Sequence, residues 1–279
     1  MLKCAKPCSM VIYTLLLLII AGLSLALWRS GRDDVHSLYQ VSTGNALIAG
    51  LFQGAVDFKT LAKKGGFGLG SVEGMDGELV AIDGTFYRIK DDGSMNIIPP
   101  EQTTPYAIVT HFKSSPNDKG LTFKLADVKD LADLTKRIDA KLPTKNIPYA
   151  IHIQGLYHTL KLRAVRGATP PYPKFMELVD NQAIFELSGK HGDGVGFFYP
   201  AYLGKVNTPG YHIHFITTDR QIGGHILDLS GASFVVSLMP VDNLQIDFPK
   251  TKEFRESKDL NTDNSQLMKD AFGAGVRLE

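Results

Sequence analysis

The chain has 279 residues, of which 44% are hydrophobic and 21% are charged, and its formal net charge is +1. This apolar content excludes an intrinsically disordered chain and is enough for one large domain or two smaller ones. Its 30 lysines and arginines are dispersed along the sequence. We therefore expect no nucleic-acid partner.

The N-terminal end differs in composition from the rest. Lys3 and Lys6 precede an uncharged apolar run over residues 10–28. A basic start followed by an apolar run is the pattern of a secretory signal peptide, and the run is also just long enough for a membrane anchor. Small residues at 24 and 26 offer a cleavage site. Because the lysines should stay in the cytoplasm, we expect the rest of the chain to be exported, either secreted or periplasmic or held by this anchor. Membrane contact is expected only through this segment.

Residues 1–28 are thus a signal peptide or anchor, and a polar linker over 29–37 leads to a first, mixed-sheet sub-domain over 38–168. Alternating apolar and polar residues predict its strands, which are 39–43, 78–83, 85–90, 107–112, 150–155 and 157–165. Leucines and an isoleucine at helical spacing predict one long helix over 125–142.

Glycine-rich residues 66–77 lack the phosphate-loop spacing and do not precede a helix, so we do not expect nucleotide binding.

A second, metal-binding sub-domain is expected over residues 169–279, beginning at Pro170 and Pro171. Its predicted strands are 182–187, 194–199, 211–217, 225–229 and 232–240, and its charged tail contains a short helix near 265–272. Many short strands and one long helix predict an α/β fold of the α+β kind. We expect two sub-domains built on mixed and antiparallel sheets with few helices.

Three of the chain's eight histidines, His212, His214 and His225, lie in one predicted β-hairpin. Residues 211–217 predict its first strand, on which side chains two apart point to the same face. A turn over 219–224 leads to the return strand that begins at His225. In such a hairpin His225 lies on the face that carries the other two, within side-chain reach.

Three converging imidazoles can hold a zinc ion and leave the fourth position to water or substrate. The ligand set favours zinc, although imidazole also binds iron, copper and nickel. The only cysteines, Cys4 and Cys8, precede the apolar run, so we expect no thiolate ligand and no disulfide in the exported part. Asp219 and Asp228 are candidate acceptors for the ring N–H groups.

Four segments, in this order, resemble the α-acetolactate decarboxylase family. They are S-T-G-N-A-L-I-A-G-L-F-Q-G from Ser42, G-F-G-L-G-S-V-E-G-M-D-G-E-L from Gly66, G-L-Y-H-T-L-K-L-R from Gly155 and H-I-H-F-I-T-T-D-R-Q-I-G-G-H from His212. The resemblance covers residues 39–244, which is most of the exported part. The predicted histidine hairpin lies inside the most distinctive of the four segments.

The resemblance implies that the three histidines hold zinc, with a catalytic glutamate at Glu78 and a catalytic, substrate-binding arginine at Arg163. Ser71 stands where the family usually has threonine, so a hydroxyl contact to the substrate is expected there. The family also uses a glutamate near its C-terminus. The tail of this chain does not align clearly, and Asp270 and Glu279 both remain candidates.

The implied activity is zinc-dependent decarboxylation of 2-acetolactate (2-hydroxy-2-methyl-3-oxobutanoate) to (R)-acetoin and CO₂, in acetoin and butanediol biosynthesis. The partner is then a small 2-hydroxy-3-oxo acid. Arg163 would bind its carboxylate and Glu78 would handle protons.

Two alternatives are open. The first is a cupin-like metal dioxygenase or isomerase, although such sites usually carry a glutamate shortly after the H-x-H pair and residues 216–219 contain none. The second is a non-catalytic exported metal-binding module. The sequence also leaves open the oligomeric state, with a homodimer among the possibilities.

Overall fold

The computed structural model describes residues 13, 15–22, 24, 36–114, 119–264 and 266–268. The chain forms two compact units, Met1–Val35 and His36–Glu279. The first unit contains the predicted signal or anchor segment, most of which lies outside the described residues, as do Asp270 and Glu279. Among the helices that the structure describes, none is both long enough and apolar enough to cross a membrane.

The unit His36–Glu279 contains a mixed seven-stranded sheet in the order β14-β1-β8-β3-β4-β5-β6. Its strands are β1 (Ser37–Val41), β3 (Phe67–Ser71), β4 (Glu78–Ile82), β5 (Thr85–Ile89), β6 (Met95–Ile97), β8 (Ala107–Thr110) and β14 (Asn243–Asp247). Every neighbouring pair is antiparallel except β1 and β14, which run parallel. A separate two-stranded sheet pairs β2 (Val56–Asp57) with β7 (Thr103–Thr104).

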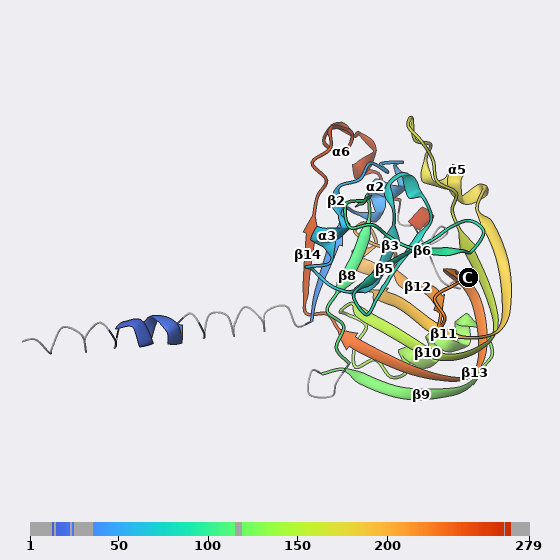
Figure 1. Ribbon diagram of the computed structural model, residues 1–279. Coiled ribbons are helices and arrows are strands. Elements are labelled where there is room, and N and C mark those ends of the chain that lie inside the picture. The colour runs from blue at the N-terminus through green and yellow to red at the C-terminus, as the bar shows by residue number, and fades with distance from the viewer. Residues whose placement is uncertain are drawn as a thin grey trace, which may run out of the picture. The chain divides into compact units, whose positions relative to one another are not determined.

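The second large sheet has five antiparallel strands, which are longer (Figure 1). They are β9 (Leu121–Val128), β10 (Tyr149–Ala164), β11 (Ala183–Tyr199), β12 (Gly210–Thr217) and β13 (Gly223–Pro240). Strand β10 pairs with both β11 and β13, and β12 also pairs with both. These four strands therefore close into a ring, and β9 extends the sheet from β13.

The described helices are short. In the unit His36–Glu279 they are α2 (Gly44–Ile48), α3 (Phe58–Leu61), α4 (Leu131–Asp139), α5 (Phe175–Asp180) and α6 (Lys252–Glu256), with 3₁₀ turns at Glu73–Met75, Ala201–Leu203 and Asp259–Asn261. Residues 266–268 and, in the other unit, residues 15–22 are also helical. The largest apolar cluster joins the two sheets, for example Val80 of β4 and Phe197 of β11. Helix α4 packs Leu134 and Ile138 on a second cluster formed by the five-stranded sheet. Burial of apolar faces against each other is the main force that holds these layers together.

The predicted fold class is confirmed, because mixed and antiparallel sheets dominate and helices are few. The helix predicted over 125–142 is wrong at its start. Residues 125–128 belong to β9, which pairs with β13. The helix begins after Asp130, whose side chain caps it by accepting a hydrogen bond from the N–H of Asp133. The apolar spacing that starts at Leu125 is compatible with the end of a strand as well as with a helix. Pairing with β13 places Leu125 in the strand.

The sheets also do not follow the predicted division into sub-domains 38–168 and 169–279. Strands β9 and β10 come before the boundary, yet they lie in one sheet with β11, β12 and β13. Strand β14 comes after it and returns to pair with β1. Because the N–H and C=O groups of a buried strand need partners, long-range pairing rather than the proline-rich segment decides how the strands are grouped.

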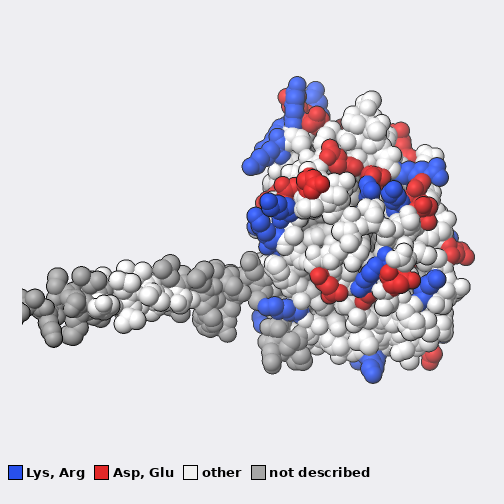
Figure 2. All heavy atoms as spheres, in the orientation of Figure 1, with Lys and Arg blue, Asp and Glu red and all other residues white. Residues whose placement is uncertain are grey.

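Basic and acidic side chains are mixed on the surface, as their nearly equal numbers in the sequence suggest. On the face of the described residues that Figure 2 shows, lysines and arginines are interspersed with aspartates and glutamates, with no extended patch of one sign. This distribution gives no support to nucleic-acid binding.

Candidate metal centre

The hairpin of β12 and β13 carries the three histidines. His214 lies directly opposite His225, followed by the pairs Phe215–Gly224 and Ile216–Gly223. The predicted pairing of these two histidines is therefore confirmed. The turn is shorter than predicted, because β13 already begins at Gly223.

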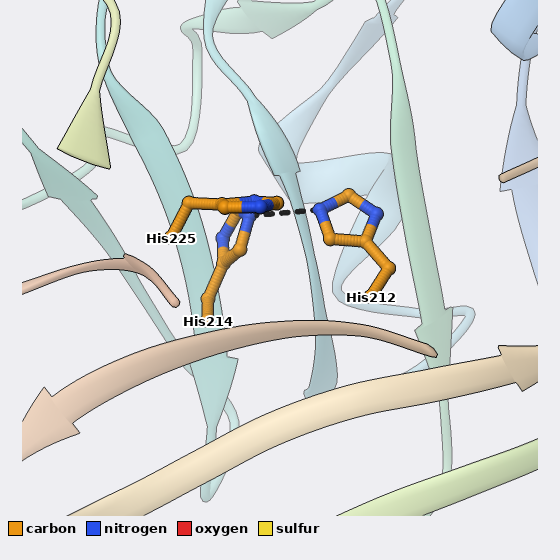
Figure 3. A group of neighbouring side chains, drawn as sticks. All are labelled: His212, His214 and His225. Atoms are coloured by element: carbon orange, nitrogen blue, oxygen red, sulfur yellow. Dashed lines mark hydrogen bonds between the residues drawn. The ribbon is translucent and has the colours of Figure 1, made fainter. Parts of the chain in front are cut away.

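The three imidazole rings point toward one another (Figure 3). One ring nitrogen from each lies within 4.8 Å of the others, and His212 Nε2 is 3.1 Å from His214 Nε2. Two nitrogen ligands of a tetrahedral zinc are expected about 3.3 Å apart. All three side chains are buried. The geometry therefore fits a group that could hold a metal ion.

The protonation of the rings also suits metal binding, which requires neutral imidazole. Burial lowers the pKa of His214 to about 3 and those of His212 and His225 well below their usual value. The Nδ1–H of His214 donates to the Leu79 carbonyl over 2.8 Å, which leaves the Nε2 lone pair for the centre. His225 Nδ1 is buried and has no hydrogen-bond partner among the described residues.

Neither candidate aspartate contacts a ring nitrogen in any described hydrogen bond. Asp219 accepts the Thr217 hydroxyl inside the hairpin turn. Asp228 accepts the backbone N–H groups of Leu131 and Leu229, and so fixes the start of α4. For His214, the carbonyl of Leu79 takes the orienting role predicted for these carboxylates.

Glu78 lies at the start of β4, where the seven-stranded sheet meets the histidine hairpin. Its Oε2 is 3.5 Å from His214 Nε2, and the side chain is buried. Burial raises the pKa of Glu78 to about 7, although the charge of Arg163 and the backbone N–H of Val165 favour the ionised form. A carboxyl in this state can hold a proton near neutral pH.

Arg163 lies directly opposite His225 on β10, so His214, His225 and Arg163 form one row across three neighbouring strands. Opposite residues in an antiparallel pair point to the same face. Arg163 is only 1% exposed, and burial lowers the pKa of its guanidinium while the charge of Glu78 raises it. Its Nη1 donates to Gln182 Oε1 over 2.9 Å.

A β-bulge makes this row possible. The register of β10 and β13 shifts between Lys161, which pairs with Asp228, and Leu162, which pairs with Ile226. The extra residue is Leu227. If Leu227 were instead paired regularly with Leu162, Arg163 would lie opposite Ile226, and its side chain would lie on the face away from His225.

Ser71 lies opposite Glu78 on β3, but its hydroxyl is used within the protein. It donates to the carbonyl of Gly77 over 2.8 Å, and only 1% of the residue is exposed. The hydroxyl thus holds the backbone beside Glu78, and the predicted contact between Ser71 and the substrate stays a prediction.

Sequence reasoning missed the residues that support the site. Asp193 of β11 accepts hydrogen bonds from His152 Nε2 at 2.8 Å and from Arg220 Nη1 at 2.6 Å. Burial raises the pKa of Asp193, but these two partners outweigh it and lower the pKa to about 2. Because Arg220 lies in the turn between β12 and β13, the ion pair ties this turn to β11. The position of Arg220 inside the histidine motif was the one available signal.

Three buried imidazoles beside a buried carboxyl and a guanidinium define a candidate metal-dependent enzyme built on a β-hairpin. A sequence model of the family described as alpha-acetolactate decarboxylase matches residues 38–261. The chain belongs to the α-acetolactate decarboxylase family. It is therefore an enzyme, a carboxy-lyase with a small-molecule substrate, and the family supports acetolactate as that substrate.

Similar proteins agree with this assignment. The alpha-acetolactate decarboxylase of Brevibacillus brevis is 35% identical over 230 residues, which are 82% of this chain and 79% of that protein. That of Methanosarcina mazei is 41% identical over 192 residues, or 69% of this chain and 65% of that protein. The crystal structure of alpha-acetolactate decarboxylase from Bacillus subtilis strain 168 matches with a TM-score of 0.80 and 31% identity, covering 85% of this chain and 99% of that one.

Proposed function

We propose that this enzyme is zinc-dependent and converts 2-acetolactate into (R)-acetoin and CO₂, in acetoin and butanediol biosynthesis. The observation that carries the proposal is the convergence of His212, His214 and His225, with Glu78 and Arg163 at the same centre. Family membership supplies the substrate, and the site supplies groups for each part of the reaction.

Decarboxylation needs an electron sink. The ketone of acetolactate is β to its carboxylate, so cleavage of the C–C bond moves the bonding pair toward the ketone and leaves an enediolate. A zinc ion held by the three histidines would supply positive charge that polarises the ketone and stabilises this developing negative charge.

Arg163 is suited to the substrate carboxylate. A guanidinium can hold a carboxylate through two parallel hydrogen bonds, and a buried guanidinium does so with little competition from water. Because Arg163 is in register with His225, a carboxylate bound to it lies beside the histidine centre. This contact orients the bond that breaks.

Glu78 is suited to the proton that follows. After CO₂ leaves, one carbon of the enediolate must accept a proton, and the face that accepts it decides the configuration of acetoin. A carboxyl with a pKa of about 7 can donate a proton near neutral pH and recover one from water. Its fixed place on β4 favours delivery to one face, which would give a single enantiomer.

The test is a direct assay of purified enzyme. With racemic 2-acetolactate, we expect acetoin and CO₂ in equal amounts and the (R) enantiomer on chiral chromatography. Removal of metal by a chelator should abolish turnover, because the three histidines alone offer no electron sink, and added zinc should restore it. Oxygen consumption by an iron-loaded protein would instead support the cupin-like alternative. Undiminished turnover after complete metal removal would contradict the proposal.

We also propose that the catalytic unit works outside the cytoplasm. The support is the sequence of the N-terminal segment, in which Lys3 and Lys6 precede the apolar run 10–28. A reporter that is active only outside the cytoplasm, fused after Arg32, should be active, and a cytoplasmic reporter fused at the same place should be silent. The reverse pattern would contradict export.

A further inference from the structure

Arg163 has a long side chain that must be held in one direction to be useful. Lysine and arginine side chains lose rotamer entropy when they are fixed in one direction. Near Arg163 lie the carboxyl of Glu78, whose charge attracts the guanidinium, and the histidine centre. A hydrogen bond to an uncharged acceptor adds to these interactions and helps to keep the guanidinium in one orientation.

Gln182 supplies a contact of this kind. Its Oε1 accepts a hydrogen bond from Arg163 Nη1 over 2.9 Å. The backbone of Gln182 is itself fixed, because its N–H donates to the Val179 carbonyl of α5 and the next residue, Ala183, pairs with Ala164 of β10. The side chain of Gln182 therefore extends from a fixed backbone next to β10, the strand that carries Arg163.

We propose that Gln182 is a positioning residue that aims the guanidinium of Arg163 at the carboxylate of the substrate, an inference that rests on the proposed function. The chemistry of the amide supports this role. A glutamine oxygen accepts the hydrogen bond but carries no net charge, so it fixes the direction of the guanidinium and leaves its charge for the substrate. A glutamate at this position would compete with the substrate carboxylate.

The test uses the zinc-loaded enzyme and two variants. Gln182→Met keeps the shape of the side chain and removes the acceptor, and Gln182→Glu keeps an acceptor and adds a negative charge. In both we expect KM for acetolactate to rise about tenfold, the equivalent of one hydrogen bond to a charged group, with a smaller change in kcat. Asn181→Ala is the matched control, because this exposed neighbouring amide bonds only the Glu177 carbonyl among the described residues.

Two probes separate positioning from a general loss of structure. The first, 2-hydroxy-2-methylpropanoate, carries the hydroxyl and carboxylate of the substrate, and the second, acetoin, has no carboxylate. Gln182→Met should weaken inhibition by the acid about tenfold and leave inhibition by acetoin and the zinc content unchanged. Equal loss for both probes, or no loss for either, would overturn the inference.

Arg163→Ala separates this inference from the proposed function. If Arg163→Ala loses affinity for the acid and Gln182→Met does not, the role of Arg163 stands and that of Gln182 is wrong. If Arg163→Ala binds the acid as well as the wild type does, the role proposed for Arg163 is wrong, and the inference about Gln182 fails with it.

Discussion

Replacing any one of His212, His214 and His225 with alanine should remove most of the bound metal and lower the rate of decarboxylation by roughly a thousandfold or more. The loss is large because metal stabilisation of the developing charge is worth several kcal/mol and two remaining imidazoles hold zinc weakly. The measurement is the metal content of each purified variant together with its kcat. Thermal unfolding with and without added zinc should show less stabilisation by zinc in each variant than in the wild type.

The control for this experiment is His158→Ala, which removes an exposed imidazole from β10. This variant should keep wild-type zinc and turnover. A triad variant with full zinc content and wild-type turnover would show that its histidine is not a ligand, and the proposed centre would then be wrong.

Replacing Glu78 with glutamine should lower kcat by roughly 10²–10⁴ with little effect on KM. Glutamine keeps the size and polarity of the side chain but cannot donate a proton from a carboxyl group. Because Glu78 acts during or after C–C cleavage, its loss affects the chemical step more than the binding of substrate. Steady-state kinetics and the configuration of the acetoin formed are the measurements.

Glu73→Gln is the matched control, since Glu73 is an exposed glutamate of the same segment whose carboxylate accepts from the Thr103 hydroxyl. Zinc content should stay normal in both variants. Near-wild-type turnover in Glu78→Gln would show that Glu78 does not transfer the proton. Loss of zinc there would instead make Glu78 a ligand, a result that its 3.5 Å distance from His214 Nε2 gives a clear structural explanation.

The parts of the site that were predictable from residues alone are local in sequence. His214 and His225 are joined by a short turn, so strand alternation and hairpin geometry were enough to place them together. Glu78 and Arg163 were named only through the family resemblance. Their approach to the hairpin depends on contacts between β4, β10, β12 and β13, which no local pattern specifies.

The same distinction between local patterns and long-range contacts explains where the predicted fold differs from the structure. Alternating residues predict the individual strands, but they do not predict the closure of β10–β13 into a ring, because it depends on pairings between residues far apart in the chain. Gln182 and Asp193 gave no signal in the sequence for the same reason. Each acts through a hydrogen bond to a side chain of another segment.

The extra residue at Leu227 has a consequence for how such an enzyme can change during evolution. The three histidines lie before this bulge, so losing Leu227 leaves their hairpin pairing intact. The same loss keeps Lys161 opposite Asp228 and Arg163 opposite His225, because it removes only the residue without a partner. Loss of one residue from β10 between Lys161 and Arg163 would instead take Arg163 out of register with His225 and turn it to the other face of the sheet. A change of a single residue in length on β10 therefore separates metal binding from the proposed recognition of the acid, whereas the same change at Leu227 does not.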